Sequence, residues 1–294
     1  MRIGINLPNY GPLGTVDTMT AIGVTAEQLG YASLWTTDHV LMPARLPEPY
    51  GHLLESMTVL TYLAARTTHI TLATSVIVLP QRDPILLAKQ AATLDHLSRG
   101  RLTLGVGVGW VEEEYRFLRA DFRRRGKLAD EYLQVMKQLW TADQPHFTGE
   151  QIQFDDVLFS PKPARTGGIP IVVGGGSQAA LTRAARFGDG WHAIAVSPAA
   201  IQTARTTLTR LAPDRRLDIS LRISTAVDPS QPQSDPDATT LTGSPNAIAA
   251  RIQQYQDAGV DEFVLDFSAA DQTAHIEHLH RFADTVLPLL TETP

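Results

Sequence analysis

Short apolar segments rich in β-branched residues alternate with longer segments of helical period along the whole chain. This alternation restricts the fold more than any other feature, because an apolar segment followed by an amphipathic one makes a βα unit. Eight such units predict a single α/β domain over 1–294, a (β/α)8 TIM barrel with insertion segments. The predicted strands are 2–6, 32–36, 70–78, 101–107, 170–174, 190–195, 218–226 and 261–267, and the predicted helices are 15–29, 55–67, 84–97, 127–140, 177–187, 198–211, 245–258 and 272–291.

Long connections follow the second, fourth and seventh predicted strands, at 37–54, 108–126 and 227–243. All three lie on the side of a barrel where the βα loops carry catalytic residues. The polar, proline-rich part of the third connection, 228–240, predicts a mobile loop. A further segment, 141–169, follows the fourth helix and contains the pattern of a small hairpin at the barrel's rim, from His146 to Phe154.

The composition excludes several classes of function. The chain has no cysteine, so disulfides, thiolate metal sites, cysteine nucleophiles and iron–sulfur clusters are ruled out, and redox chemistry needs a bound cofactor. Its 25 basic and 31 acidic residues give a net charge of −6 with one basic cluster, Arg123 to Lys127, so nucleic acid is not an expected partner. The sequence has neither a signal-peptide pattern nor an apolar run of about 18 residues. We therefore expect a cytoplasmic protein that does not enter a membrane.

The segment Asp38-His39 follows the second predicted strand. At the carboxyl end of a barrel strand a histidine faces the mouth, and its pKa range suits proton transfer to or from a substrate. The alternative is structural, with Asp38 as the cap of the following loop and His39 as a buried hydrogen-bonding residue. Both interpretations are open at this point, and His39 is the candidate proton donor or acceptor.

Glycines alternate at the end of the fourth predicted strand, at Gly105, Gly107 and Gly109. Glycine loses packing in a strand, so another group must lie close to this backbone. The spacing fails the Rossmann pattern, because Trp110 stands where the last glycine of that pattern belongs. The three glutamates 112–114 that follow are interpreted as the solvated first turn of a helix.

Two other strand ends indicate a bound ligand. Thr74 and Ser75 interrupt a β-branched run, which a ligand near the backbone would explain, although a core strand ending in a turn accounts for most of the segment. After the fifth predicted strand, Gly174-Gly175-Gly176-Ser177 opens a helix, where backbone N–H groups at the positive end of the dipole suit a phosphate. The alternative for this turn is a tight connection with Ser177 as an N-cap.

Together these segments resemble the luciferase-like monooxygenase family, in the branch that uses the deazaflavin coenzyme F420. The resemblance is dense over 1–195, and Gly243-Ser244-Pro245 carries it in the last third. The motifs that carry it in the first part are Gly4-Ile5-Asn6-Leu7-Pro8, Ser33-Leu34-Trp35-Thr36-Thr37-Asp38-His39-Val40, Ala73–Arg82, Leu94–Arg101, Gly105–Trp110 and Gly188-Asp189-Gly190-Trp191.

The resemblance implies a (β/α)8 barrel with the cofactor ring at its mouth. It implies that the ring lies against a bulge after the third strand that contains a non-prolyl cis peptide, here Ser75-Val76, with Asp38 and His39 beside it. It assigns the phosphate to the glycine turn after the fifth strand. The cofactor-binding residues that it implies in this chain are Asp38, Thr74, Ser75, Val76, Gly107, Gly109, Val173, Gly174, Gly175, Gly176 and Ser177.

The resemblance also implies the chemistry. A deazaflavin has carbon in place of the nitrogen with which a flavin activates dioxygen, so we expect an oxidoreductase that transfers hydride between F420 and a small organic substrate. His39 handles the accompanying proton. Relatives that oxidise sugar phosphates carry a catalytic glutamate directly after the strand-four glycines, whereas this chain has Trp110 there. We therefore expect Trp110 to line an apolar substrate pocket, and the substrate itself is not predicted.

Other functions and partners are weighed against this one. FMN-dependent relatives share the motifs, so FMN is the alternative cofactor. A metal-dependent barrel hydrolase is disfavoured and no metal is expected, since His39 and His192 are the only histidines near predicted strand ends. The presence of His39 also disfavours a non-catalytic cofactor-binding protein. Similar proteins dimerise through the region of helices 55–67 and 84–97, so we expect a homodimer, although ordinary packing on the barrel would also explain these helices.

Overall fold

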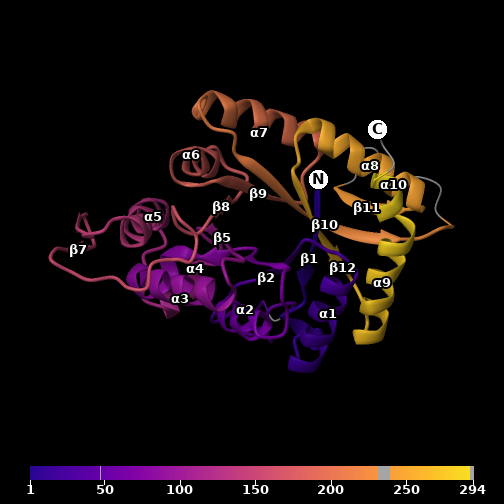
Figure 1. The fold of residues 1–294 in the computed structure, drawn as a ribbon, viewed down its shortest axis with the longest axis horizontal. Coiled ribbons are helices and arrows are strands. Elements are labelled where there is room, and N and C mark those ends of the chain that lie inside the picture. Colours follow the sequence, from indigo (N-terminus) through magenta and orange to yellow (C-terminus); the bar gives the residue numbers. More distant parts are fainter. Residues whose placement is uncertain (47, 231–238, 292–294) are drawn as a thin grey trace.

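The strands close into a parallel barrel, as predicted (Figure 1). The structure, a computed structural model, describes residues 1–46, 48–230 and 239–291. Eight of the ten strands of the main sheet form the ring, which closes because β9 pairs with β10, β10 with β12, and β12 with β1. In ring order they are β1 (Arg2–Leu7), β2 (Ser33–Thr36), β3 (Thr71–Thr74), β5 (Leu102–Gly107), β8 (Ile171–Gly174), β9 (Gly190–Ile194), β10 (Asp218–Val227) and β12 (Glu262–Phe267). The short strands β4 (Ile77–Val78) and β11 (Thr240–Gly243) pair with β5 and β10.

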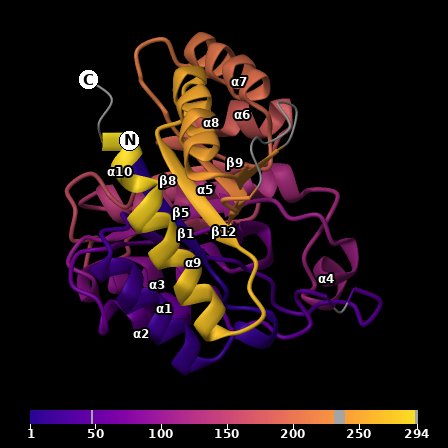
Figure 2. The ribbon, with the colours of Figure 1, turned by 90° about the vertical axis from the view of Figure 1, so that its right-hand side faces the viewer.

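Helices cover the outside of the ring (Figures 1 and 2). They are α1 (Val16–Gln28), α2 (Ser56–Ala64), α3 (Pro84–Leu97), α5 (Arg125–Thr141), α6 (Gln178–Phe187), α7 (Pro198–Leu211), α8 (Pro245–Ala258), α9 (Gln272–Thr285) and α10 (Leu287–Thr291), with 3-10 turns η1 (Gly11–Leu13) and η2 (Leu79–Gln81). The short helix α4 (Glu112–Phe117) lies apart from them, in the connection after β5 (Figure 2). The predicted last helix is two helices, because Pro288 has no N–H to donate and its ring clashes with the preceding turn. No helix in the described ranges is long and apolar enough to cross a membrane.

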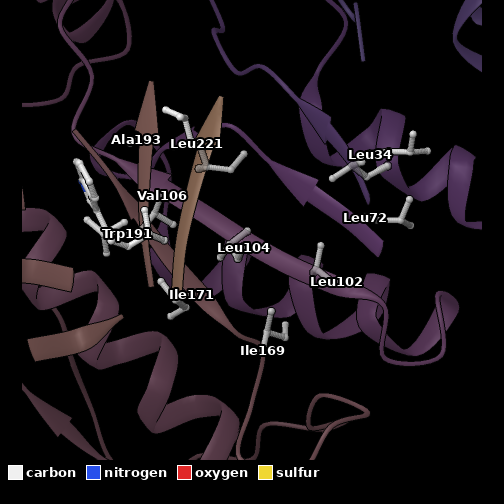
Figure 3. Packing of buried hydrophobic residues seen from close by; sticks show 14 of the residues in the cluster. Leu34, Leu72, Leu102, Leu104, Val106, Ile169, Ile171, Trp191, Ala193 and Leu221 are labelled. Atoms are coloured by element: carbon white, nitrogen blue, oxygen red, sulfur yellow. The ribbon is translucent and has the colours of Figure 1, made fainter. Parts of the chain in front are cut away.

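Alternate side chains of each strand face the helices or the inside of the ring. The side chains that face the helices form the larger core. Figure 3 shows part of it, with Leu34, Leu72, Leu102, Leu104, Val106, Ile171, Ala193 and Leu221, which belong to β2, β3, β5, β8, β9 and β10. Inside the ring lies a smaller cluster of Trp35, Ala73, Val172 and Val264. The interior is therefore a packed core, and the space for a ligand lies at its end.

The insertions match the sequence in part. The predicted hairpin is confirmed as antiparallel strands β6 (Phe147–Thr148) and β7 (Gln153–Phe154). It lies against α5, where Glu131 Oε1 accepts two backbone hydrogen bonds of 2.8 Å from the hairpin turn. Of the predicted mobile loop 228–240, residues 231–238 lie outside the described residues, and the loop leads into β11, which the sequence did not predict.

Candidate active site

A cavity of about 300 Å³ opens at the carboxyl ends of the strands, in the mouth of the barrel. It is termed the first cavity. Most of the predicted site residues line it: Asp38, His39, Ser75, Val76, Gly107, Gly109, Trp110, Gly174 and Gly175. It is also lined by residues that the sequence did not single out, namely Thr37, Tyr50, Val78, Val108, Ile194 and Arg222.

Four predicted residues do not line the first cavity. Thr74 is fully buried and its hydroxyl donates to a carbonyl oxygen of β5 at 2.7 Å. Val173 packs in the outer core. Gly176 and Ser177 lie on the exposed side of their turn, where Ser177 Oγ accepts a hydrogen bond of 3.2 Å from a backbone N–H of α6. The contacts of Thr74 and Val173 are structural, whereas the glycine turn borders the cavity through its first two residues.

His39 is buried in the wall of the first cavity and is held by a carboxylate. Its Nδ1 lies 2.9 Å from Oε2 of Glu114. Its ring contacts the rings of Tyr50 and Trp110, at centroid distances of 4.8 and 6.2 Å. None of the residues that the structure describes provides a partner for Nε2. The ring nitrogen available to a ligand is therefore Nε2.

Glu114 is a further site residue that the sequence did not reveal. The prediction of a solvated first turn fits Glu112, which is exposed, but it is wrong for Glu114, which is 1% exposed. The Glu114 Oε1 atom accepts hydrogen bonds from the backbone N–H groups of Val40 (2.6 Å) and Leu41 (3.1 Å). Burial raises the pKa of Glu114, but the hydrogen bonds from His39 and Val40 outweigh it and hold the pKa below its usual value. Glu114 is therefore a carboxylate that fixes both the imidazole and the loop after it.

Asp38 makes the contacts of a structural residue. Its Oδ1 accepts from Arg82 Nη2 at 2.5 Å, and its Oδ2 accepts from the backbone N–H of Val78 at 3.0 Å. Arg82 also pairs with Glu55 at 3.0 Å. This buried ion pair ties the end of β2 to β4, and with it one wall of the first cavity.

The segment after β3 is a bulge whose Ser75-Val76 peptide is cis, as the resemblance implies. Glycines of β5 and β8 make room for its valine. A Cβ on Gly107 would lie 2.7 Å from Val76 Cγ2, and one on Gly174 would lie 3.1 Å from Val76 Cγ1. A Cβ on Gly105 would lie 1.8 Å from a carbonyl oxygen of β3. The alternating glycines therefore accommodate the segment after β3 that lines the cavity: Gly107 lies against Val76, and Gly109 lies against Val78, with Val78 Cγ1 2.6 Å from a Cβ placed on it.

A buried histidine holds this bulge from inside the ring. His192 Nε2 lies 2.8 Å from Ser75 Oγ, and Nδ1 lies 2.8 Å from Ser220 Oγ. Burial, with a smaller contribution from the charge of Arg222, lowers the pKa of His192 to about 3. The imidazole is therefore neutral near neutral pH and acts as a hydrogen-bonding support.

The turn from Gly174 to Ser177 offers a place for an anion. It leads from β8 into α6, so its backbone N–H groups lie at the positive end of a helix. A Cβ on Gly176 would meet no atom within 4 Å, so the space beside it is open. Trp191 Nε1 donates to the carbonyl oxygen of Gly175 at 2.8 Å and fixes the turn.

Comparison with known proteins gives a family and several relatives. A family model described as luciferase-like monooxygenase matches residues 1–234. The chain is 35% identical over 188 residues to the uncharacterized protein Rv0953c of Mycobacterium tuberculosis, and the match covers 59% of this chain and 66% of that protein. It is 34% identical over 197 residues to the pyrimidine monooxygenase RutA of Variovorax paradoxus, and this match covers 63% of this chain and 50% of that protein. The chain thus matches 66% or less of the length of these relatives.

Solved structures share the fold over nearly the whole chain. An F420-dependent secondary alcohol dehydrogenase in complex with an F420–acetone adduct has a TM-score of 0.82 at 18% identity and covers 98% of both chains. The FMN-bound oxygenating constituent of 3,6-diketocamphane monooxygenase from Pseudomonas putida has a TM-score of 0.79 at 15% identity and also covers 98% of both. These likenesses concern the fold, whereas the family model covers most of the sequence. The protein belongs to the luciferase-like monooxygenase family.

Proposed function

We propose that the protein is an oxidoreductase that binds coenzyme F420 in the first cavity and transfers hydride between its deazaflavin ring and a small organic substrate. The observation that carries the proposal is that the His39–Glu114 pair, the Ser75-Val76 bulge and the glycine turn after β8 meet at one cavity. The F420-dependent alcohol dehydrogenase of the same fold supports a deazaflavin. The FMN-bound structure supports FMN as the second candidate.

The residues around the first cavity fit a flat ring that carries a phosphate. Val76, Val78, Val108 and Trp110 provide apolar contacts for a ring. The cavity volume of about 300 Å³ is at the lower end of the range for ligand pockets, roughly 300–1,000 Å³. The N–H groups of the glycine turn would hold the phosphate beside the cavity, where Gly176 leaves open space. When bound, the ring supplies or takes up the hydride.

His39 is placed to move the proton that accompanies the hydride. Because Glu114 is a carboxylate, it accepts the Nδ1 proton of the neutral imidazole and leaves a lone pair on Nε2. Nε2 then takes the proton of a substrate hydroxyl as that group becomes a carbonyl, and returns it in the reverse direction. The rings of Tyr50 and Trp110 lie against His39 and limit the access of water to it.

Titration of the purified protein with F420 and, separately, with FMN tests the cofactor. We expect a saturable difference spectrum with F420 at micromolar concentrations and binding at least tenfold weaker with FMN. The opposite order would make FMN the cofactor, and binding of neither would overturn the proposed function. With the cofactor fixed, turnover is measured over a panel of small alcohols and ketones.

The role of His39 is tested with a matched pair of variants. His39→Ala should keep cofactor affinity and lose about 10²-fold in turnover, because a general acid–base is removed. His52→Ala is the control, since this exposed histidine of the same connection does not line the first cavity and its Nε2 lies 3.0 Å from the backbone carbonyl oxygen of Gly14. Equal turnover in the two variants would remove His39 from the mechanism.

We also propose that the protein is a homodimer formed through α3. Ile85, Leu86 and Leu97 are 39%, 58% and 58% exposed on this helix, and an apolar surface of this kind favours association. Light scattering should give twice the 32.1 kDa mass of one chain. Leu86→Glu should give the mass of one chain, and a monomeric wild-type protein would contradict the proposal.

A further inference from the structure

A second cavity, of about 390 Å³, lies at the same end of the barrel. It is formed at the ends of β1, β10 and β12 together with η1, and its lining includes Pro8, Tyr10, Leu13, Ser224, Asp266 and Phe267. None of the residues that the sequence singled out for the site lines it. It opens on the face of the barrel that carries catalysis in proteins of this fold.

A hydrogen-bonded wall of Arg222, Asp266 and Tyr10 borders both cavities. Arg222 lines the first cavity, and the other two residues line the second. Arg222 donates to Asp266 Oδ2 from Nε (2.9 Å) and Nη2 (2.6 Å), and Nη2 also donates to the Tyr10 hydroxyl oxygen at 3.0 Å. Asn6 Nδ2 lies behind the wall and donates to Asp266 Oδ1 at 3.2 Å and to Tyr10 at 3.3 Å. The position of the Tyr10 hydroxyl is therefore fixed from two sides.

The proton of the Tyr10 hydroxyl is the feature of this wall that points to a ligand. The hydroxyl oxygen accepts from Arg222 and Asn6, and no acceptor for the proton is found among the residues that the structure describes. Burial raises the pKa of Tyr10 despite the nearby Arg222, so the phenol keeps its proton. An oxygen atom of a ligand in the second cavity is the acceptor that this arrangement lacks.

The charges around the second cavity select a neutral ligand. The charge of Arg222 is matched by Asp266, and none of the described residues that line this cavity is basic. A carboxylate or phosphate would instead face the carboxylates of Asp266 and Glu48. Leu13 and Phe267 provide apolar contacts for the remainder of the ligand.

We propose that the second cavity is the substrate site and that it takes a small neutral molecule whose carbonyl oxygen accepts a hydrogen bond from the Tyr10 hydroxyl. Because the wall borders both cavities, this bond places the carbonyl carbon next to the first cavity. Tyr10 is then a specificity-determining residue for neutral carbonyl compounds. Only the identification of this ligand as the substrate rests on the proposed function, since the binding itself needs no cofactor.

The test uses cyclohexanone as a neutral probe and cyclohexanecarboxylate as a charged probe of the same ring size. Binding is measured by ligand-observed NMR on the purified full chain, with and without saturating F420 or FMN. We expect cyclohexanone to bind in both conditions and the carboxylate to bind at least tenfold more weakly. Tyr10→Phe should weaken cyclohexanone binding about tenfold, the value of one neutral hydrogen bond, and leave the cofactor affinity unchanged. Tyr62→Phe is the control and should leave cyclohexanone binding unchanged, because this tyrosine of α2 lines neither cavity and its hydroxyl contacts Thr20 and Arg66.

Ser224→Trp provides a second variant, because an indole at this end of β10 would fill the second cavity and should abolish cyclohexanone binding. Displacement of cyclohexanone by the cofactor would place the probe in the first cavity and overturn the proposal. Equal binding of the carboxylate, unchanged affinity in both variants, or no saturable binding of cyclohexanone would also overturn it. A chain that binds cyclohexanone as expected but neither cofactor would overturn the proposed function and leave this inference standing.

Discussion

Replacing Glu114 by glutamine should reverse the tautomer of His39 and leave the fold intact. In the native chain, Glu114 Oε1 accepts hydrogen bonds from the backbone N–H groups of Val40 and Leu41. Its Oε2 lies 2.9 Å from His39 Nδ1 and accepts a hydrogen bond of 3.2 Å from the Gln81 amide. The introduced amide keeps an oxygen on the two backbone N–H groups and presents its NH₂ to Nδ1. Nδ1 must then accept, so Nε2 carries the proton. Gln81 can turn its amide over to adapt, because its Oε1 is buried with no hydrogen-bond partner among the described residues.

The magnitudes follow from these bonds. A hydrogen bond to a charged group contributes about 1.5–3 kcal/mol and a neutral one about 0.5–1.5 kcal/mol, so Glu114→Gln should cost about 1–2 kcal/mol of stability. Glu114→Ala leaves buried donors unpaired and should cost about 3–5 kcal/mol. Turnover of Glu114→Gln should fall about 10²- to 10⁴-fold, because Nε2 of the neutral imidazole can no longer accept a proton.

The pH dependence of stability gives an independent check. The folded pKa of Glu114 lies below its unfolded value, so its contribution is present above the unfolded pKa and is lost as pH falls through the folded pKa. Glu114→Gln has no such titration. Its urea midpoint should therefore fall less than that of the wild type as the pH is lowered below about 4.5.

Imidazole ¹⁵N shifts report the tautomer of His39 without any cofactor, and steady-state turnover reports the rate. Glu113→Gln is the control on the same helix, because Glu113 is 31% exposed and pairs with Arg45, which is 61% exposed. This control should stay within about 0.5 kcal/mol of the wild type and keep its tautomer. A Glu114→Gln variant with the wild-type rate and an Nδ1 proton would refute the role given to the pair.

Gly107→Ala should destabilise the protein by about 1–3 kcal/mol in urea denaturation, because its methyl would lie 2.7 Å from Val76 Cγ2. Gly176→Ala meets no atom within 4 Å and should change stability by less than about 0.5 kcal/mol, while weakening the binding of a phosphate-bearing cofactor in the difference spectrum. Acid should destabilise the fold through His192. The pKa of this residue is about 3 in the folded chain and about 6.5 in the unfolded chain, so the unfolded chain binds more protons than the folded chain as the pH falls below about 6.5. At about 1.4 kcal/mol per pKa unit this loss approaches about 5 kcal/mol at a pH near 3, and His192→Asn should flatten the dependence of the urea midpoint on pH over that range.

The parts of the molecule that the sequence predicted are those that depend on local structure. Each βα unit is specified by its own periodicity, and strand direction alone brings His39, Ser75 and Gly174 to one end of the barrel. The pairs between loops and strands are not local, since His39 and Glu114 are 75 residues apart and Tyr10 and Arg222 are 212 residues apart. Such pairs depend on insertion conformations that spacing does not specify.

The burial of Glu114 is an example of what the sequence pattern leaves open. Successive residues of a helix point about 100° apart, so the three glutamates 112–114 span about 200° around the axis. A helix that is buried along one stripe can leave an arc of this width exposed, so the three glutamates alone do not require any of them to be buried. The helix buries Glu114 and Tyr115, which lie next to each other on its inner side. Which partner receives the carboxylate depends on the 37–54 connection, and the sequence pattern holds no information on that contact.

The inside of the ring supports the mouth through polar contacts as well as apolar packing. Trp35 is the largest of the four residues in the inner cluster. Its ring stacks on that of His192 with a centroid distance of 4.7 Å, and its Nε1 donates a hydrogen bond of 2.8 Å to Ser33 Oγ. His192 in turn holds Ser75 of the bulge. A continuous set of contacts therefore connects the centre of the barrel to the lining of the first cavity. Trp35 lines neither mouth cavity, yet Trp35→Phe removes the indole donor and part of this stack, so it should loosen the bulge and weaken cofactor binding together with stability.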